Sequence, residues 1–361
     1  MATDPVPHRN NGPRGEKLGW FPPRTVLSSG PKVPALRILV PETGPFHDGG
    51  QGPACGFCTR GWRTGLRGGG LIHGPSPFPL FDGMETTLIS AVPDAIFMSV
   101  NSENLERAIV SAIRNGVEDQ DIAVAFSGGL DSGLVAAIAK DYARSVTLYT
   151  SGKEQSYDVV MAQEMSERLG LPWLHIPITA DNIESRLREM ITITGTSSPL
   201  TLSFELPLFF VCRTVHEKLI LGGQGSDELF AGYSKYVGMP DDELARAMKS
   251  DMGKLITSTI PHETKVADHF GKKILYPYMD PIVTMQVNAM DLKELKPADA
   301  DSRKVLLKQV ARNLGYPFIA EKRKKAAQYG SGTMDLVREV AKNKGMTYSE
   351  LVDSIYREIF E

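Results

Sequence analysis

The chain has 361 residues, of which 42% are hydrophobic, enough for one large α/β domain or for two domains. Its net charge of −3 provides no basic field for a nucleic acid, and no run of about eighteen apolar residues could span a membrane. Three cysteines cannot form a disulfide framework and the N-terminus lacks the apolar core of a signal peptide, so we expect a cytoplasmic protein without a membrane or nucleic-acid partner.

Residues 1–83 differ in composition from the rest of the chain. About a third of them are glycine or proline, and they show little hydrophobic periodicity. We expect a poorly ordered extension here, followed by one globular domain over residues 84–361, with Met84 as a candidate for the native start.

Two cysteines in this extension have the spacing of half a zinc site. Cys55 and Cys58 are flanked by His47 and His73. A second Cys-x-x-Cys pair is absent and Cys212 lies in an apolar helical stretch, so we favour two incidental cysteines in a loop over a zinc site.

Residues 101–116 predict the first helix of the globular domain. Its apolar side chains fall on one face, Asn101 or Ser102 suits the cap, and Gly116 suits the end. The apolar run 122–126 then predicts a buried strand.

The stretch Ser127-Gly128-Gly129-Leu130-Asp131-Ser132 joins that strand to the next predicted helix. Its two adjacent glycines let the backbone turn with its N–H groups inward, and the helix start adds donors and the positive end of a dipole. Ser127 and Ser132 add hydroxyl donors, while the carboxylate of Asp131 lies where a phosphate would bind and therefore calls for a bridging Mg²⁺. The alternative is a glycine turn with an Asp-Ser helix cap, and the Walker ending Gly-Lys-Ser/Thr is missing.

Strands and helices alternate after this loop. We expect strands at 146–149 and 173–178 and helices at 157–169 and 181–193. This alternation predicts an α/β fold with a parallel sheet, right-handed crossovers and a ligand at the carboxyl ends of the strands, the sheet core lying at about 118–235.

A second strand-end loop follows a helix predicted over 205–216. The strand 218–221 leads into Gly222-Gly223-Gln224-Gly225-Ser226 and then into an acidic helix start at Asp227. Ser226 and Asp227 suit a helix cap in any protein. We favour a functional role, in which Asp227 meets Asp131 and completes the magnesium shell, because three glycines in five residues imply close approach of the backbone to a partner.

The remaining part, about 236–361, is predicted to be mostly helical, with interruptions such as Tyr276-Pro277-Tyr278-Met279-Asp280. Within it, Lys322-Arg323-Lys324-Lys325 forms a basic cluster. Such a run is usually a solvated face, although the small residues and glycines after it suit a loop in which a lysine could meet phosphate charge.

These motifs in this order resemble the synthetase domain of asparagine synthetases and their β-lactam synthetase relatives, over roughly residues 100–335. The first loop alone resembles that of the PP-loop ATP pyrophosphatases. The resemblance implies an adenine-nucleotide α-hydrolase-like fold with a mostly helical C-terminal half. It rests on the first loop, Gly152 with Asp158, the stretch 221–233, the stretch 276–280 and the lysine cluster.

The resemblance also implies an ATP-dependent ligase that requires Mg²⁺. A small carboxylate, with aspartate as the first candidate, would attack the α-phosphorus of ATP, and ammonia would then displace AMP from the acyl-adenylate. The implied roles are the pyrophosphate loop for Ser127, Gly128, Gly129, Asp131 and Ser132, magnesium binding for Asp131 and Asp227, adenosine contact for Phe126, Ser151 and Gly223, and charge stabilisation for Lys325 or, failing that, Lys324.

Three positions depart from the family pattern. Ala2 stands where the family's glutaminase half has its nucleophilic cysteine, so we expect the chain to use free ammonia, a separate glutaminase subunit or another amine. Gln224 stands where the asparagine-forming enzymes have a glutamate, which puts aspartate as the substrate in doubt. Gly133 replaces a serine, a minor loss of one donor.

Two other functions remain open on the sequence. A PP-loop enzyme of the tRNA-thiolation type would need metal on the N-terminal cysteines and a basic surface near the site. A non-catalytic ATP-binding partner of an amidotransferase would bind nucleotide without releasing pyrophosphate, but both aspartates and the lysine cluster are present, which argues against lost chemistry.

Overall fold

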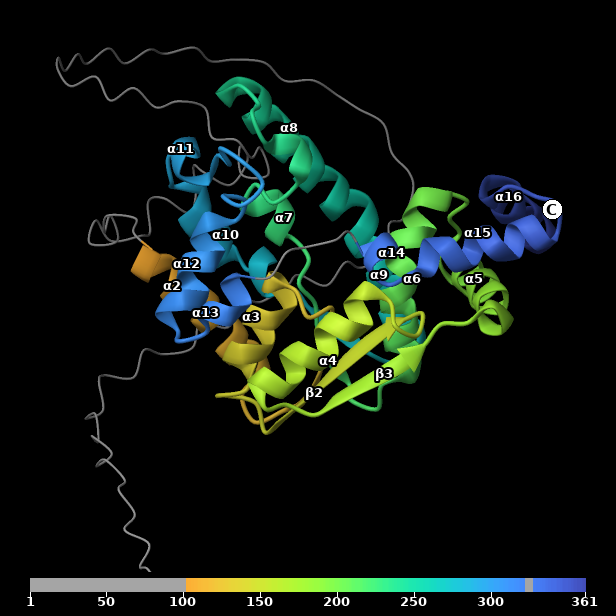
Figure 1. Cartoon of the computed structure of the whole chain (residues 1–361), viewed down its shortest axis with the longest axis horizontal. Coiled ribbons are helices and arrows are strands. Elements are labelled where there is room, and N and C mark those ends of the chain that lie inside the picture. Colours follow the sequence, from red (N-terminus) through yellow and green to blue (C-terminus); the bar gives the residue numbers. More distant parts are fainter. Residues whose placement is uncertain (1–101, 322–326) are drawn as a thin grey trace, which may run out of the picture. The chain divides into compact units, whose positions relative to one another are not determined.

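The computed structural model describes residues 102–321 and 327–361 (Figure 1). Contacts divide the chain into the units Met1–Gly70 and Leu71–Glu361, and every described residue belongs to the second unit. The predicted extension, the start at Met84, the pair Cys55 and Cys58, and the candidates Lys324 and Lys325 all lie outside the described residues.

A five-stranded parallel sheet confirms the predicted fold class. Its strands are ordered β3-β2-β1-β4-β5, and each neighbouring pair is parallel. The chain moves outward from β1 through β2 to β3 and then returns to the other side of β1 for β4, so the order reverses between β1 and β4. The strands are β1 (Asp121–Ala125), β2 (Ser145–Gly152), β3 (Trp173–Pro177), β4 (Leu219–Leu221) and β5 (Lys273–Leu275).

The central strand is apolar on both faces because each face packs against a separate core. Ile122 and Val124 point into the first core, whereas Ala123 between them points into the second. The helices of the first core are α2 (Ser102–Val117), α3 (Leu130–Ala139), α4 (Tyr157–Leu169), α7 (Ser226–Leu229), α8 (Asp241–Lys254), α10 (Pro281–Asn288), α11 (Leu292–Leu295), α12 (Val305–Asn313) and α13 (Pro317–Ala320). The carboxyl ends of β1 and β4 thus lie between two helical layers.

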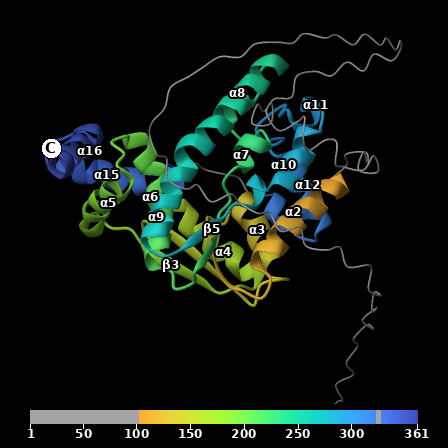
Figure 2. The same cartoon turned by 180° about the vertical axis from the view of Figure 1, so that it is seen from behind.

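The second core contains the helices that follow β3 together with the C-terminal helices, and Figure 2 shows α9 beside β5. Its helices are α5 (Ala180–Thr194), α6 (Pro199–Thr214), α9 (Ile260–His269), α15 (Thr333–Asn343) and α16 (Tyr348–Phe360), and the short α14 (Ala327–Gly330) contacts α6 and α15. Among the described helices, none combines the length and the apolarity needed to cross a bilayer.

Two elements differ from the sequence prediction. The helix expected over 205–216 begins earlier, because Pro199 suits a first helical turn and the hydroxyl of Ser198 accepts the N–H of Thr201 at 3.3 Å. The edge strand β5 lies in the half that was expected to be mostly helical; with three residues it is too short to show a strand periodicity.

Candidate active site

The loop after β1 (residues 126–129) needs its first glycine for two reasons. Gly128 has a φ of +69°, which disfavours a side chain, and a Cβ there would lie 2.6 Å from backbone atoms of Met161 and Ala162 in α4. Helix α3 begins directly after Gly129, and the Ser127 N–H donates to the hydroxyl of Ser132 at 3.2 Å. This confirms the predicted strand, loop and helix.

The loop after β4 (residues 222–225) packs directly on the first loop. A Cβ on Gly223 would lie 3.2 Å from the Cβ of Asp131, and one on Gly222 would lie 3.0 Å from the ring of Tyr276. The glycines therefore allow close approach to protein atoms on both sides, as their spacing suggested.

A buried lysine joins the two predicted carboxylates. The Nζ of Lys304 lies 2.7 Å from Asp131 Oδ1 and 2.8 Å from Asp227 Oδ1, and it donates to the hydroxyl of Ser226 at 2.9 Å. Lys304 is 4% exposed and has a φ of +55°, immediately before α12. A Cβ on Gly232 would lie 2.1 Å from its Cε, so that glycine makes room for the lysine. The structure therefore brings Asp131 and Asp227 together on one cation.

These two carboxylates fit the magnesium that the fold family implies. Both already converge on one positive charge, the ammonium of Lys304. Within residues 102–321 and 327–361, no group of three His, Cys, Asp or Glu side chains could hold a metal ion by itself. A magnesium ion held by the two carboxylates would therefore take its remaining ligands from phosphate oxygens and water.

A cavity of about 190 Å³ opens between the two loops. Of the predicted ligand-binding residues, it is lined by Phe126, Ser127, Asp131, Ser132, Ser151 and Gly223. Gly128, Gly129 and Asp227 do not line this cavity, although Asp227 shares Lys304 with the lining residue Asp131. The other wall is apolar and comes from α6, through Phe204, Pro207, Leu208 and Val211.

A buried carboxylate, Glu263 on α9, lines the same cavity. Its Oε1 accepts the amide N–H of Gln224 at 2.7 Å, and its Oε2 accepts the hydroxyl of Tyr276 at 2.5 Å. Burial raises the pKa of Glu263 to about 7, although the hydrogen bonds from Tyr276 and Gln224 oppose the shift. Gln224, a neutral residue where the resemblance leads one to expect a glutamate, thus holds the carboxyl group of Glu263 in place.

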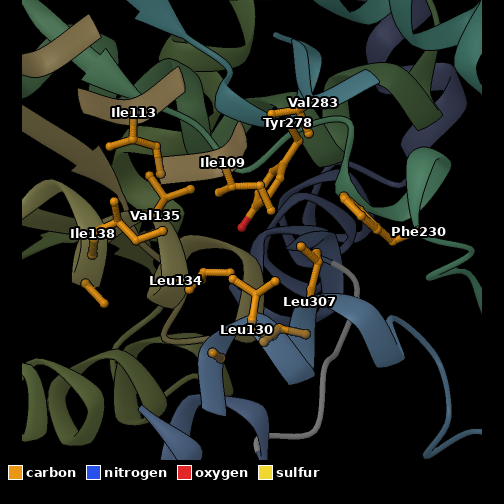
Figure 3. Packing of buried hydrophobic residues seen from close by; sticks show 14 of the residues in the cluster. Ile109, Ile113, Leu130, Leu134, Val135, Ile138, Phe230, Tyr278, Val283 and Leu307 are labelled. Atoms are coloured by element: carbon orange, nitrogen blue, oxygen red, sulfur yellow. The ribbon is translucent and has the colours of Figure 1, made fainter. Parts of the chain in front are cut away.

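The stretch 276–280 connects this carboxylate with the first loop. Tyr276 contacts Glu263, whereas the hydroxyl of Tyr278 donates to the backbone carbonyl of Asp131 at 3.0 Å. Tyr278 is fully buried, and Figure 3 shows it among the apolar side chains of the first core. Two tyrosines of one short turn, η6 (Pro277–Met279) with its preceding residue, thereby link Glu263 to the first loop.

A second buried acid, Glu205 on α6, lies behind this carboxylate. Burial, and to a lesser degree the charge of Glu263, raises the pKa of Glu205 to about 9, while burial lowers the pKa of His262. The 3.4 Å contact between Glu205 Oε1 and His262 Nδ1 therefore joins two neutral groups at pH 7 rather than an ion pair. Among the described residues, neither oxygen of Glu205 has a hydrogen-bond partner.

Replacing Glu205 with glutamine is expected to change how stability depends on pH. In the unfolded chain a glutamate ionises near 4.5, whereas Glu205 holds its proton up to about pH 9, so the stability present below pH 4.5 is lost as the pH rises toward 9. We expect Glu205→Gln to remove this loss, which amounts to at most about 1.4 kcal/mol per pH unit. Urea unfolding at several pH values, with the exposed Glu339→Gln as control, measures it; parallel curves for the wild type and Glu205→Gln would contradict the assignment.

Comparison with known proteins shows which family the central part of the chain matches. Residues 104–241 match the family model described as asparagine synthase. A putative glutamine-hydrolyzing asparagine synthetase of Methanocaldococcus jannaschii is 25% identical over 298 residues, 71% of this chain and 55% of that protein. Asparagine synthetase B of Escherichia coli is 26% identical over 221 residues, 55% of this chain and 40% of that protein. The chain thus spans about half the length of these relatives.

Among solved structures, the NMN synthetase of Francisella tularensis aligns over 72% of this chain and 94% of its own, at 12% identity and a TM-score of 0.36. The family match covers β1, both strand-end loops and Asp227, which are the elements that carry the predicted motifs. Residues 104–241 therefore form an asparagine synthase domain, as the motifs of the two loops predicted.

Proposed function

We propose that the protein is an ATP-dependent ligase that adenylates a small carboxylate and then forms an amide with ammonia or another amine. The observation that carries this proposal is the convergence of Asp131 and Asp227 on one buried cation, beside a cavity at the switch point of the sheet. The asparagine synthase domain over residues 104–241 supports it independently.

In the first step, a carboxylate oxygen attacks the α-phosphorus of ATP and pyrophosphate leaves. The start of α3 and the hydroxyls of Ser127 and Ser132 offer donors to phosphate oxygens. Asp131 and Asp227 would hold Mg²⁺, which when bound would offset the charge of the leaving pyrophosphate. Lys325 lies outside the described residues and stays our candidate for charge at the reacting carboxyl group.

In the second step, the amine attacks the acyl carbon and AMP leaves. The nitrogen must lose a proton, and the carboxylate of Glu263 is our candidate to accept it because Glu263 lines the cavity, with one oxygen fixed by Gln224 and the other by Tyr276. A pKa of about 7 lets Glu263 exchange a proton at neutral pH. Ammonia, free or delivered by a separate glutaminase subunit, is the proposed amine, and aspartate the first carboxylate to test.

The test measures pyrophosphate and AMP formed from ATP and Mg²⁺ over a panel of carboxylates, with L-aspartate first and ammonia present. We expect release that depends on one carboxylate and falls by about 10²-fold or more in Asp131→Asn, which keeps the shape of the side chain but removes its charge. If ATP binds and no carboxylate elicits pyrophosphate, the proposal fails and a tRNA substrate or a regulatory role takes its place.

A further inference from the structure

A second cavity, of about 580 Å³, adjoins the first and shares Asp131 with it. Lys304 lines this second cavity, and Asp131, with which it is paired, lines both. The other charged residues that line the second cavity are the cations Arg303, Lys308 and Arg312 and the carboxylates Asp301 and Glu321. Four cations thus face three carboxylates, one of which is already paired with Lys304.

Among the described residues, the three remaining cations form no direct ion pair with a carboxylate. Arg303 donates to the backbone carbonyls of Ala300 and Gly232, at 3.0 and 3.2 Å, and Lys308 donates to the backbone carbonyl of Asp301 at 2.5 Å. Arg312 is exposed at the cavity wall. Hydrogen bonds to neutral carbonyls hold these side chains in position but leave their positive charge available to an anion.

The charges also act on one another. The pKa of Lys308 is lowered chiefly by burial and further by Arg303 and Arg312, while the nearby aspartates only partly oppose the shift. The repulsion between like charges in one cavity costs free energy, and an anion bound among them would offset that cost. The cavity therefore suits a compact ligand with several negative charges.

The position of the second cavity indicates which anion would reach it. Asp131 lines both cavities and its partner Lys304 lines the second, and in the proposed reaction these two residues flank the pyrophosphate end of ATP. Pyrophosphate is the only product of that reaction with high charge and no organic part. It also forms on the side of the nucleotide away from the acyl-adenylate, which must stay in place for the amine.

We propose that this basic cavity binds the released inorganic pyrophosphate, so that pyrophosphate leaves past Lys304 while the acyl-adenylate remains in the first cavity. The proposal rests on the proposed function and deepens it, because it assigns a product site to Arg303, Lys308 and Arg312. No bond forms or breaks in this step.

The test is calorimetric titration of magnesium pyrophosphate into the full-length protein without ATP or a carboxylate. We expect Arg312→Gln and Lys308→Met each to weaken binding by about tenfold, the loss of one charge-assisted hydrogen bond. Glutamine and methionine are good helix formers, so α12 should be retained, which thermal unfolding verifies. Arg357→Gln, at an exposed site on α16, is the matched control and should bind pyrophosphate as the wild type does.

The outcomes separate this proposal from the proposed function, because binding is measured without turnover. Weakened binding in both variants supports the product site even if no carboxylate is ever turned over. Unchanged affinity in both variants overturns it even in an active enzyme. Equal affinity for pyrophosphate, phosphate and sulfate at one ionic strength would also overturn it, since that result describes a counter-ion effect and not a site.

Discussion

Lys304→Met is expected to destabilise the protein strongly in metal-free buffer. The substitution leaves the buried Asp131 and the half-buried Asp227 close together without their shared, buried cation, and removal of one partner from a buried ion pair costs about 3–5 kcal/mol. Urea unfolding in the presence of a chelator measures the change. Lys249→Met, at an exposed site on α8, is the control and should lie within about 0.5 kcal/mol of the wild type.

Magnesium should then act differently on the variant and on the wild type. In Lys304→Met the two carboxylates can take up Mg²⁺ directly, and a ligand at a hundred times its Kd adds about 2.7 kcal/mol of stability. In the wild type the lysine competes for the same oxygens, so Mg²⁺ alone should stabilise less. Pyrophosphate release should fall by about 10²-fold in the variant because a charge beside the leaving group is lost. Equal stability of Lys304→Met and Lys249→Met in the chelator would contradict the ion network.

Glu263→Gln is expected to slow amide formation far more than adenylation. Glu263 accepts a proton only when ionised, so the wild-type rate of amide formation should rise as the pH increases through about 7. Glutamine cannot accept the proton, and we expect a loss of about 10²–10⁴-fold together with the disappearance of this rise. The rate must be measured at a constant concentration of unprotonated ammonia, because the nucleophile also titrates.

Two comparisons make this prediction specific. The single-turnover burst of pyrophosphate reports the first step and should be largely retained in Glu263→Gln, since in the proposed mechanism Glu263 acts only on the amine. Glu205→Gln is the matched control, because it changes the neighbouring buried acid but leaves Glu263 with both of its hydrogen bonds. A pH profile that keeps its rise near 7 in Glu263→Gln would exclude this residue as the base.

The strand-end loops could be predicted from the sequence because their signals are local. Glycines directly after an apolar run indicate a tight turn, and the alternation of strands with helices places both turns at one edge of the sheet. The meeting of Asp131 with Asp227 followed from that topology alone. In the structure both carboxylates contact Lys304, and their joint binding of magnesium stays a prediction.

Lys304 and Glu263 could not be predicted in this way. Lys304 lies 173 residues after Asp131, and nothing in its own surroundings distinguishes it from lysines on the surface. The one sequence feature related to Lys304 is Gly232, because a side chain at position 232 would collide with the lysine. Glu263 stands between polar residues on α9, a helix that packs against α5, α6 and β5, and its burial depends on this packing. Such long-range contacts depend on how elements assemble, and local patterns do not encode them.

The two tyrosines around η6 also bear on how the substrate range could be changed. Tyr276 and Tyr278 form a tyrosine corner that links Glu263 to the first loop, so a change there would disturb both proposed reaction steps at once. Phe204 and Leu208 on α6 form part of the apolar wall of the cavity and contact neither tyrosine through a hydrogen bond. Engineering toward bulkier carboxylates should therefore begin on α6, at Phe204 and Leu208, and leave the tyrosine corner untouched.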